Sequence, residues 1–471
     1  MIKSLLCFSL FLLTAQGFAA DWSSKVEGII KKEIKDIDTK KSQYGIWIKK
    51  GDQITTLNAD QKLTPASLSK IPTALAFLEK QPLSEKFKTW IYHTGKIQKG
   101  ELKGDLYLKG GGDPTFVTES MWLMINELKR NDINKISGNL YVDETFFDQD
   151  YYSKGRQQRR VDRAYDAPVS ALSFNWNSLS IYVRPGKNSG DEARVYVDPE
   201  LPNIVIKNKA KTTGHSKTEL KVTRKIKNGK IIVDVKGKIS TSKDEKAFYK
   251  SIGDAALWTG DTFKMLLNQS GISYKGDVTK KKTPDNAKML VEYDGWSMPR
   301  VLAALSKFSN NFVAEMLTKH LGKKETQPGN IKDGLVEIRN YLNKSGWQQE
   351  EFTFENPSGF TRKNKMRADR LGELLYGARN DFTSSPEFLS SLPISGVDGT
   401  LKTRMKHALK SKVRAKTGYM SGIVGLAGYL ESPKKGEEPI TFVFLYNGPY
   451  KKDWDVRAMY GRLLWKIYQI K

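Results

Sequence analysis

The chain has 471 residues, with 78 Lys and Arg against 52 Asp and Glu, a formal net charge of +26. This length is enough for two or three domains with large cores. Its one cysteine, Cys7, lies in the N-terminal apolar segment, so the rest of the chain has no disulfide, thiolate metal site or cysteine nucleophile. The four histidines show no metal-ligand spacing. We therefore expect no metal and no cofactor, and we expect the histidines to be solvated.

The first twenty residues have the order of a secretory signal. A charged start at Lys3 precedes an apolar run from Leu5 to Leu13, and small residues follow before Asp21. The apolar run is too short for a membrane-spanning helix. We predict that residues 1–20 are a cleaved signal peptide and that the mature chain has no transmembrane segment.

The positive charge is uneven, because residues 201–250 hold 14 Lys and Arg against 4 Asp and Glu. In an exported protein, nucleic acid is not an expected partner. Long-range attraction instead favours anionic envelope polymers or carboxylate-rich substrates. A solvated sheet face is an equally good interpretation of this segment.

Helix and strand signals alternate at the start of the mature chain. Residues 22–38 have helical periodicity, and residues 44–49 and 53–57 are predicted strands around a Gly51-Asp52 turn. An extended approach then turns into an apolar helix at Ser67.

From about residue 93 to residue 290, short strands separated by turn signals dominate. Residues 104–114 indicate a strand ended by a glycine turn, and residues 194–197 and 203–207 are further strands. Asn228-Gly229 between two alternating runs is the signature of a two-residue hairpin. We predict a β-rich insertion over 93–290, made of two subdomains, that splits a helix-plus-sheet domain formed by residues 21–92 and 291–471.

The last part of the chain returns to helices near residues 298–305 and 311–317. Strands follow at 412–417, 423–430 and 440–445, and an aromatic-rich helix closes the chain at 453–470. We expect this helix to pack on the sheet rather than lie on a membrane, because it directly follows a strand. The predicted fold class is therefore multi-domain α+β.

Ser67-Leu-Ser-Lys70 is the first candidate catalytic motif. Residues at i and i+3 of a helix are neighbours, so Lys70 lies beside Ser67 and, if neutral, can take its proton. The helix start also offers free N–H groups to a developing oxyanion. The same spacing recurs at Ser240 and Ser432, but without an apolar helical run behind the serine.

Two further motifs share the helical domain with Ser67. Ser309-Asn310-Asn311 lies between two apolar helices, where a loop can aim a hydroxyl and an amide into a cleft. Lys416-Thr417-Gly418 lies in a predicted strand, and a glycine there lets a substrate approach the backbone.

Ser-x-x-Lys, Ser-x-Asn and Lys-Thr-Gly in this order resemble the signature of penicillin-recognising serine enzymes. The gap of 242 positions from Ser67 to Ser309 is longer than in serine β-lactamases. The gap and the segments 110–115, 167–172 and 396–401 resemble the class C low-molecular-mass penicillin-binding proteins. These are D-alanyl-D-alanine carboxypeptidases/endopeptidases of the penicillin-binding protein 4 type. The resemblance implies a transpeptidase-like domain, an antiparallel sheet flanked by helices, that is split by the insertion.

The resemblance also implies a role for each residue of the three motifs. Ser67 attacks a D-alanyl peptide bond of a peptidoglycan stem and forms an acyl-enzyme, and β-lactams acylate it as covalent inhibitors. Lys70 is the base, with a pKa lowered by burial and by the charge of Lys416. Ser309 relays the proton to the leaving amine, and Asn311 holds the substrate amide.

By the same resemblance, Lys416 and Thr417 bind the terminal carboxylate of the substrate, next to Gly418. The N–H groups of Ser67 and Tyr419 form the oxyanion hole, and Arg362 matches a family arginine that faces the substrate. Family members often have Ser or Thr where this chain has Tyr419.

A second departure from the family pattern concerns the preference for the stem peptide. Arg160 occupies a position that is acidic in family members of the kind that reads peptidoglycan side chains. Asp398 and Arg404 are expected to be structural rather than catalytic.

The predicted function is that of a serine DD-peptidase secreted to the periplasm. Two alternatives remain from the sequence: a β-lactamase-like hydrolase on the same scaffold, and a catalytically idle wall-binding protein that uses the basic insertion.

Overall fold

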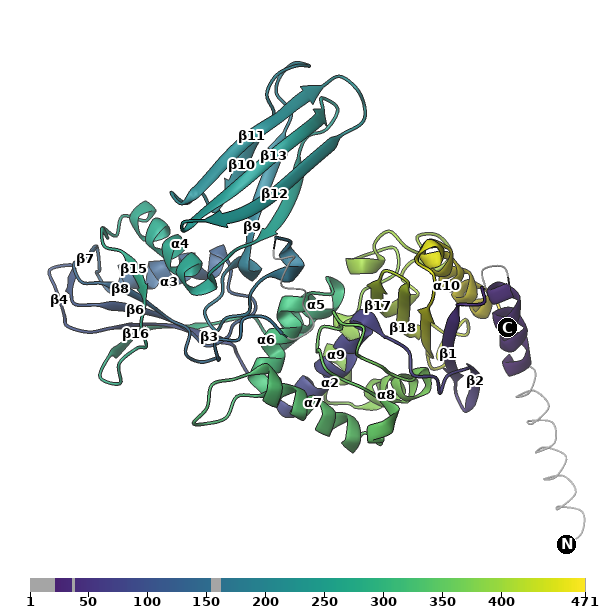
Figure 1. Cartoon of the computed structure of the whole chain (residues 1–471). Helices are drawn as coiled ribbons and strands as arrows, with labels where there is room; N and C mark the ends of the chain where they lie inside the picture. Colours follow the sequence, from purple (N-terminus) through teal and green to yellow (C-terminus); the bar gives the residue numbers. More distant parts are fainter. Residues whose placement is uncertain (1–21, 36–38, 154–161, 471) are drawn as a thin grey trace, which may run out of the picture. The chain divides into compact units, whose positions relative to one another are not determined.

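The computed structural model describes residues 22–35, 39–153 and 162–470 (Figure 1). The predicted signal peptide and Arg160 lie outside this described part. None of the described helices is both long enough and apolar enough to cross a membrane. The chain divides into two compact units, the first made of Met1–Leu83, Met298–Ala314 and Leu335–Lys471, the second of Ser84–Ser297 and Glu315–Gly334.

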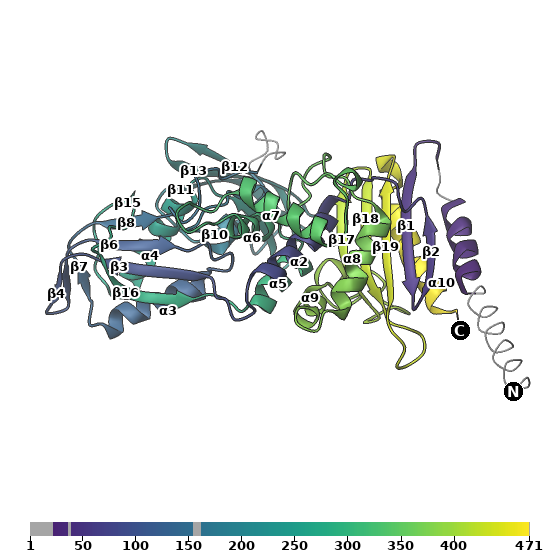
Figure 2. The same cartoon turned by 90° about the horizontal axis from the view of Figure 1, so that it is seen from below.

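The first unit is built on a five-stranded antiparallel sheet with the order β17-β18-β19-β1-β2 (Figure 2). Its strands are β1 (Gln43–Lys50), β2 (Gln53–Leu57), β17 (Val413–Met420), β18 (Ile423–Leu430) and β19 (Ile440–Asn447). Every residue of β18 is buried, because helices cover both faces of the sheet. The strands predicted in the last part of the chain are confirmed, and β17 forms an edge of this sheet.

Two helices cover the opposite faces of this sheet. Helix α8 (Ala368–Asn380) lies on β19 and β1, where the side chain of Trp47 packs against Gly372. Helix α10 (Asp453–Tyr468) lies against β18 on the other face, in a core cluster that includes Ile46 and Ile48. The helix at residues 22–35 joins the same cluster. The prediction that the closing helix packs on the sheet is thus confirmed.

The first unit contains further helices besides these two. Helix α5 packs on both α2 and α9. The bounds are η1 (Ala66–Ser69), α2 (Lys70–Lys80), α5 (Met298–Lys307), α6 (Asn311–Leu321, of which the first turn belongs to this unit), α7 (Ile331–Lys344, which belongs to this unit from Leu335) and α9 (Ser385–Ser391).

The second unit holds one five-stranded sheet, three three-stranded sheets and helices around its own core. One sheet has the order β15-β8-β6-β3-β16, with a small β4-β5-β7 sheet beside it in the chain. The bounds are β3 (Lys88–His93), β4 (Lys96–Gln98), β5 (Glu101–Lys103), β6 (Leu106–Gly110), α3 (Thr118–Arg130), β7 (Lys135–Ile136), β8 (Leu140–Asp143), α4 (Ala255–Gln269), β15 (Val278–Lys280) and β16 (Lys288–Asp294).

Strands β3 and β16 pair with each other in this sheet. Strand β3 ends at the boundary predicted at residue 93, and strand β16 spans the boundary predicted at residue 290. Both strands belong to the second unit. The sequence could not show this pairing, because each strand alone has the same alternating pattern as the strands of the first unit.

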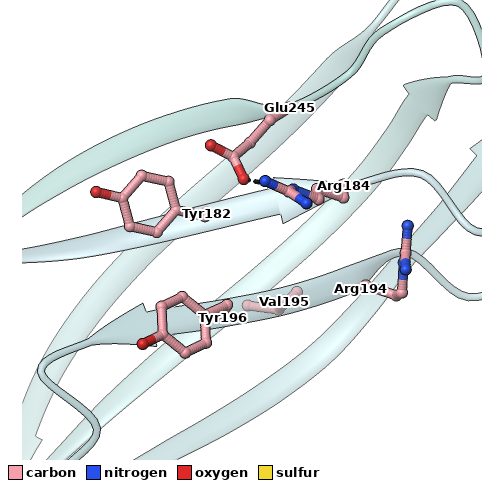
Figure 3. Close-up of a pocket in the computed structure, with 6 residues that line it drawn as sticks. All are labelled: Tyr182, Arg184, Arg194, Val195, Tyr196 and Glu245. Carbon is pink, nitrogen blue, oxygen red and sulfur yellow. Dashed lines mark hydrogen bonds and ion pairs between the residues drawn. The ribbon is translucent and has the colours of Figure 1, made fainter.

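Two three-stranded sheets complete the second unit, with the orders β10-β9-β14 and β11-β13-β12. Their bounds are β9 (Ser178–Arg184), β10 (Arg194–Asp198), β11 (Ile204–Thr213), β12 (Glu219–Lys227), β13 (Lys230–Ser240) and β14 (Lys246–Ser251). Asn228 and Gly229 both have positive φ between β12 and β13, as the predicted hairpin turn requires. The outward face of the β10-β9-β14 sheet carries tyrosine and arginine side chains (Figure 3).

The expectation of solvated histidines is wrong for His93, which is buried on β3, and for His320. The His320 ring packs against Phe87, Phe146 and Phe147, and its Nε2 lies 2.8 Å from the carbonyl oxygen of Gly112. Burial disfavours the imidazolium and lowers the pKa of His320 to about 4. The lysines near His320 in sequence misled the prediction, because the adjacent Lys319 is itself buried rather than solvated.

Candidate active site

Ser67 lies in the single turn η1, and helix α2 begins at Lys70. The Nζ of Lys70 donates a hydrogen bond to Ser67 Oγ at 3.1 Å, so the i to i+3 neighbourhood predicted from the sequence is present. Ala66 before the serine has a φ of +48°, a conformation that residues with a Cβ rarely adopt. Such strain concentrates at functional sites, where the surrounding packing holds it in place.

Glycines form the surface on which the Ser67 turn rests. Gly418 and Gly425 are opposite each other on β17 and β18. A Cβ on Gly418 would lie 2.5 Å from the carbonyl oxygen of Pro65, and one on Gly359 would lie 1.9 Å from that of Ala66. The space beside Gly418 is therefore taken by the turn that carries the serine, so this glycine positions Ser67 against the edge strand.

Lys70 is buried and donates hydrogen bonds to other groups besides Ser67. Its Nζ donates to Asn311 Oδ1 at 2.7 Å and to the carbonyl oxygen of Ser358 at 2.6 Å. Asn311 opens helix α6, directly after the Ser309-Asn310 loop. The first and second sequence motifs thus meet at the amino group of Lys70.

Lys416 links the second motif to the third. Its Nζ donates to Ser309 Oγ at 2.7 Å and to the carbonyl oxygen of Thr417 at 2.8 Å, and its side chain is only 1% exposed. Among the described residues, no carboxylate lies within ion-pair distance of this amino group. Burial alone lowers the pKa of Lys416 to about 7. Ser309, with a φ of +55°, is thereby held next to a lysine that is only partly charged at neutral pH.

The segment 356–364 is part of the site, but the sequence analysis singled out only Arg362 within it. Asn356 Oδ1 accepts hydrogen bonds from the backbone N–H and the hydroxyl of Ser358, at 3.0 and 2.7 Å. Asn364 Nδ2 donates to Ser69 Oγ at 2.9 Å and to the carbonyl oxygen of Asn356 at 2.7 Å. These bonds fix the loop whose Ser358 carbonyl holds Lys70. The Asn-Pro-Ser-Gly sequence signals only a turn.

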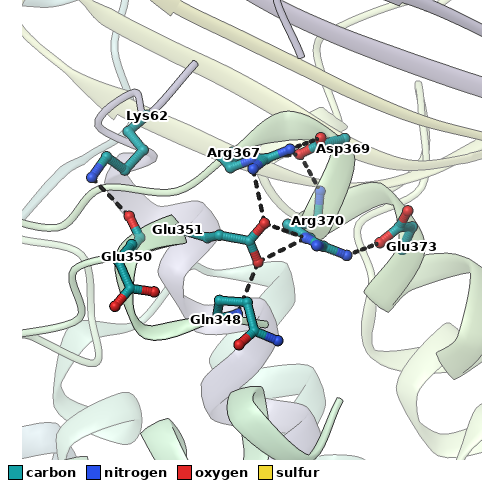
Figure 4. A network of polar contacts seen from close by, with 8 residues as sticks. All are labelled: Lys62, Gln348, Glu350, Glu351, Arg367, Asp369, Arg370 and Glu373. Carbon is teal, nitrogen blue, oxygen red and sulfur yellow. Dashed lines mark hydrogen bonds and ion pairs between the residues drawn. The ribbon is translucent and has the colours of Figure 1, made fainter. Parts of the chain in front are cut away.

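A network of charged side chains anchors both ends of this segment (Figure 4). Glu351 accepts hydrogen bonds from Arg367 and Arg370, at 2.8 and 2.9 Å, and from the backbone N–H of Gln348. Burial raises the pKa of Glu351, but the hydrogen bonds outweigh this effect and leave its pKa below the ordinary value. Leu63, in the approach to Ser67, pairs with Met366 beside this network.

Thr417 and the loop before β17 also contact each other. The Oγ1 of Thr417 donates to Thr400 Oγ1 at 2.9 Å. In the same loop, Asp398 accepts from Lys307 Nζ at 2.6 Å and from the backbone N–H of Ile394 at 2.8 Å. Asp398 thus ties the loop to α5, in line with its expected structural role. Arg404 is partly buried, and this burial together with the charge of Arg457 lowers its pKa to about 10.

Tyr419 and Arg362 lie at the end of the β17–β18 hairpin. The half-exposed Tyr419 ring is covered by the guanidinium of Arg457, whose Cζ is 3.8 Å from the ring centroid. The same guanidinium lies 4.8 Å from the ring of the exposed Trp454. Arg362 Nη2 donates to the carbonyl oxygen of Ser421 at 2.5 Å. The predicted substrate-binding residues therefore border the outer end of the edge strand.

Within the described part of the chain, no group of three His, Cys, Asp or Glu side chains is arranged to hold a metal ion. The chemistry that these residues offer is that of a serine hydroxyl beside a buried amine, with a second hydroxyl–amine pair two residues from Asn311. This arrangement defines a penicillin-recognising serine peptidase.

Comparison with known proteins identifies the family. The chain belongs to the D-Ala-D-Ala carboxypeptidase 3 (S13) family, which it matches over residues 26–461. It is 29% identical over 415 residues to the D-alanyl-D-alanine carboxypeptidase of Actinomadura sp. (strain R39), an alignment covering 84% of this chain and 76% of that protein. It is 24% identical to the D-alanyl-D-alanine carboxypeptidase DacB of Haemophilus influenzae, covering 84% and 82% of the two chains.

The fold agrees with this assignment. The crystal structure of penicillin binding protein 4 (dacB) from Haemophilus influenzae superposes with a TM-score of 0.78 at 23% identity, and covers 93% of this chain and 98% of that one. The chain is therefore a class C enzyme of the penicillin-binding protein 4 type, a serine D-alanyl-D-alanine carboxypeptidase/endopeptidase.

Proposed function

We propose that Ser67 is the nucleophile that cleaves D-alanyl peptide bonds of peptidoglycan stems through an acyl-enzyme. The observation that carries this proposal is the hydrogen bond from the buried Lys70 amine to Ser67 Oγ. When neutral, this amine takes the hydroxyl proton as Ser67 attacks the carbonyl carbon. The backbone N–H groups of Ser67 and Tyr419 then receive the oxyanion.

Ser309 and Lys416 form the second acid–base pair of the proposed mechanism. When the C–N bond breaks, the leaving amine needs a proton, and Ser309 Oγ can supply it while Lys416 replaces that proton. The 2.7 Å contact between these two groups supports the relay. Asn311 orients the substrate amide from the other end of the same loop. Water then cleaves the ester by the reverse sequence and frees Ser67.

Thr417 and Arg457 are the proposed partners of the substrate's terminal carboxylate. Thr417 and Tyr419 are alternate residues of β17, so their side chains point to the same face. The Cζ of Arg457 lies 3.8 Å from the centroid of the Tyr419 ring, and a guanidinium held there can donate a bidentate pair of hydrogen bonds to a carboxylate. Tyr419 thus replaces a lost hydroxyl contact by holding a cation in place.

This role of Arg457 predicts a dependence on the substrate's free carboxylate. Arg457→Ala is expected to raise the KM for peptides ending in free D-alanine by about tenfold, the value of one charge-assisted hydrogen bond. The same peptides with an amidated C-terminus are expected to be poor substrates of both proteins to a similar degree. Steady-state kinetics on the peptide pair measures this, with Lys452→Ala, on the same surface, as control. An equal loss on both peptides would contradict the assignment.

We further propose that the protein is exported to the periplasm and acts on the intact wall, both as a carboxypeptidase and as a cross-link endopeptidase. Muropeptides incubated with the wild type and with Ser67→Ala test the function by mass spectrometry. The wild type is expected to release D-alanine and to convert cross-linked dimers to monomers, and Ser67→Ala to do neither. A fluorescent penicillin should label the wild type persistently. Fast turnover of the label would indicate a β-lactamase instead, and no label an idle wall-binding protein.

A further inference from the structure

The three-stranded β10-β9-β14 sheet of the second unit has a hollow on its open face (Figure 3). Its volume is about 420 Å³, within the range of sites that bind small molecules in proteins. It is lined by Tyr182, Arg184, Arg194, Val195, Tyr196 and Glu245. None of these residues belongs to the motifs that carry the proposed catalysis.

Two tyrosines form one rung of this surface. Tyr182 on β9 and Tyr196 on β10 are directly opposite each other, with ring centroids 6.1 Å apart and planes inclined by 28°. Residues alternate along β9, so Ile181 and Val183 enter the core while Tyr182 points outward. Tyr196 is 55% exposed, and neither ring belongs to the hydrophobic core cluster of this unit. The result is a flat aromatic surface with a polar rim of hydroxyl groups.

Two arginines form the next rung. Arg184 and Arg194 are also directly opposite, and like charges in this position repel each other. Arg184 Nε donates to Glu245 at 2.6 Å, whereas Arg194 Nε donates only to the carbonyl oxygen of Pro185 at 3.3 Å. Among the described residues no carboxylate lies within ion-pair distance of Arg194. This surface therefore offers one unneutralised guanidinium beside two aromatic rings.

We propose that this rung pair, Tyr182–Tyr196 with Arg184–Arg194, is a second, non-catalytic binding site for a glycan strand whose substituents carry carboxylates. Sugar rings present flat C–H faces that pack on tyrosine rings, with hydroxyl groups that the tyrosine hydroxyls can bond. A carboxylate on the adjacent substituent meets Arg194 in the planar geometry that guanidinium favours. The basic segment 201–250 of the same unit adds long-range attraction for such a polyanion.

The proposal rests on the proposed function in one respect: the polymer bound here is the one whose stems the active site cleaves. A site for the glycan in the second unit would keep the enzyme on the polymer between cleavage events. It would act through effective concentration and leave the chemistry at Ser67 unchanged.

Direct binding to soluble glycan strands tests the proposal. The full chain carrying Ser67→Ala is titrated with strands that retain their peptide stems and with strands from which an amidase has removed them. The combined Tyr182→Ala and Tyr196→Ala change is expected to weaken binding of both probes tenfold or more. Arg194→Glu is expected to weaken binding of the stem-bearing strands tenfold and to affect the stem-free strands much less.

Matched controls come from α3 of the same unit. Trp122→Ala removes a ring that is also 55% exposed, and Lys129→Glu makes the same change of net charge as Arg194→Glu. Both are expected to bind as the parent does. Equal weakening by Lys129→Glu and Arg194→Glu, or equal binding of an unrelated polyphosphate, would reduce the site to general charge attraction and overturn the proposal. Unchanged binding by the tyrosine variants would also overturn it.

Two measurements keep this result separate from the proposed function and from misfolding. The single Tyr196→Ala variant changes the more exposed of the two tyrosine rings. It is expected to fold and to lose part of the affinity for the glycan. Penicillin acylation of the variants with Ser67 restored is expected to match the wild type. If the wild type releases no D-alanine, the catalytic proposal alone is refuted. If the tyrosine and arginine variants are acylated normally and bind glycan as tightly as the parent, the glycan site alone is refuted.

Discussion

Lys416 in the first unit and Lys319 in the second are both almost completely buried, but their surroundings differ. Lys319 Nζ lies 2.5 Å from Asp148 Oδ1 and donates to the carbonyl oxygen of Asp150 at 2.7 Å. Within the described part of the chain, Lys416 Nζ has only a hydroxyl and a carbonyl as partners, and its pKa falls to about 7. A carboxylate balances the charge of Lys319, whereas the partners of Lys416 among the described residues are uncharged dipoles.

This difference distinguishes a lysine buried in a stabilising ion pair from a lysine buried for acid–base chemistry. A buried lysine next to a carboxylate remains a cation that holds two elements together. A buried lysine among dipoles is close to giving up its proton, which is the property that an acid–base group needs. Lys70 donates hydrogen bonds to Ser67, Asn311 and the Ser358 carbonyl. The comparison can be tested by changing each lysine in turn.

The largest effect is expected from Lys70→Met, which keeps the size of the side chain and removes the amine. Acylation by penicillin should slow by about 10³-fold, the usual contribution of a general base. The free energy of unfolding should change little, because the cost of burying the amine disappears along with its hydrogen bonds. Stopped-flow acylation and urea unfolding measure the two quantities. A large loss of stability with normal acylation would show that Lys70, like Lys319, has a structural role.

Lys319→Met is expected to have the opposite outcome. It leaves Asp148 without its partner, which should lower the free energy of unfolding by about 3 kcal/mol, at the lower end of the range for buried ion pairs because Asp148 is partly exposed. Acylation of the folded fraction should be normal. Adding Asp148→Asn should recover part of the stability. Full stability of the single variant would show that the ion pair contributes nothing.

The smallest expected effect is a pH dependence due to Lys416. The proposed relay needs the Lys416 cation, because Lys416 returns to Ser309 the proton that goes to the leaving amine. This cation is present below the pKa of about 7 and lost above it. The kcat/KM of the wild type should therefore fall as the pH rises above about 7, because this parameter follows the free enzyme. Lys416→Arg remains charged at every accessible pH and should lack this fall, even if its overall rate is lower. An unchanged basic limb in that variant would assign the ionisation to another group.

Sequence patterns were sufficient where the signal is local. The strands of the first unit, the closing helix, the 228–229 hairpin turn and the placement of Lys70 beside Ser67 follow from periodicity, turn chemistry and i to i+3 spacing. Patterns failed where the partner is distant or has no side-chain signature. The Ser358 carbonyl that holds Lys70 is a backbone group, and any residue could supply it. The burial of His320 depends on three phenylalanines from other segments.

The sequence by itself determined the chemistry of this protein: a serine, two lysines, a second serine and an asparagine, in an order that one family of serine peptidases shares. Only the tertiary structure decided their electrostatic state. Burial without a carboxylate, rather than residue type, brings the pKa of Lys416 near 7. Gly359 and Gly418, distant in sequence, leave the space that the Ser67 turn occupies. Desolvation and close packing depend on what surrounds a residue in space, and a linear pattern records only what surrounds it along the chain.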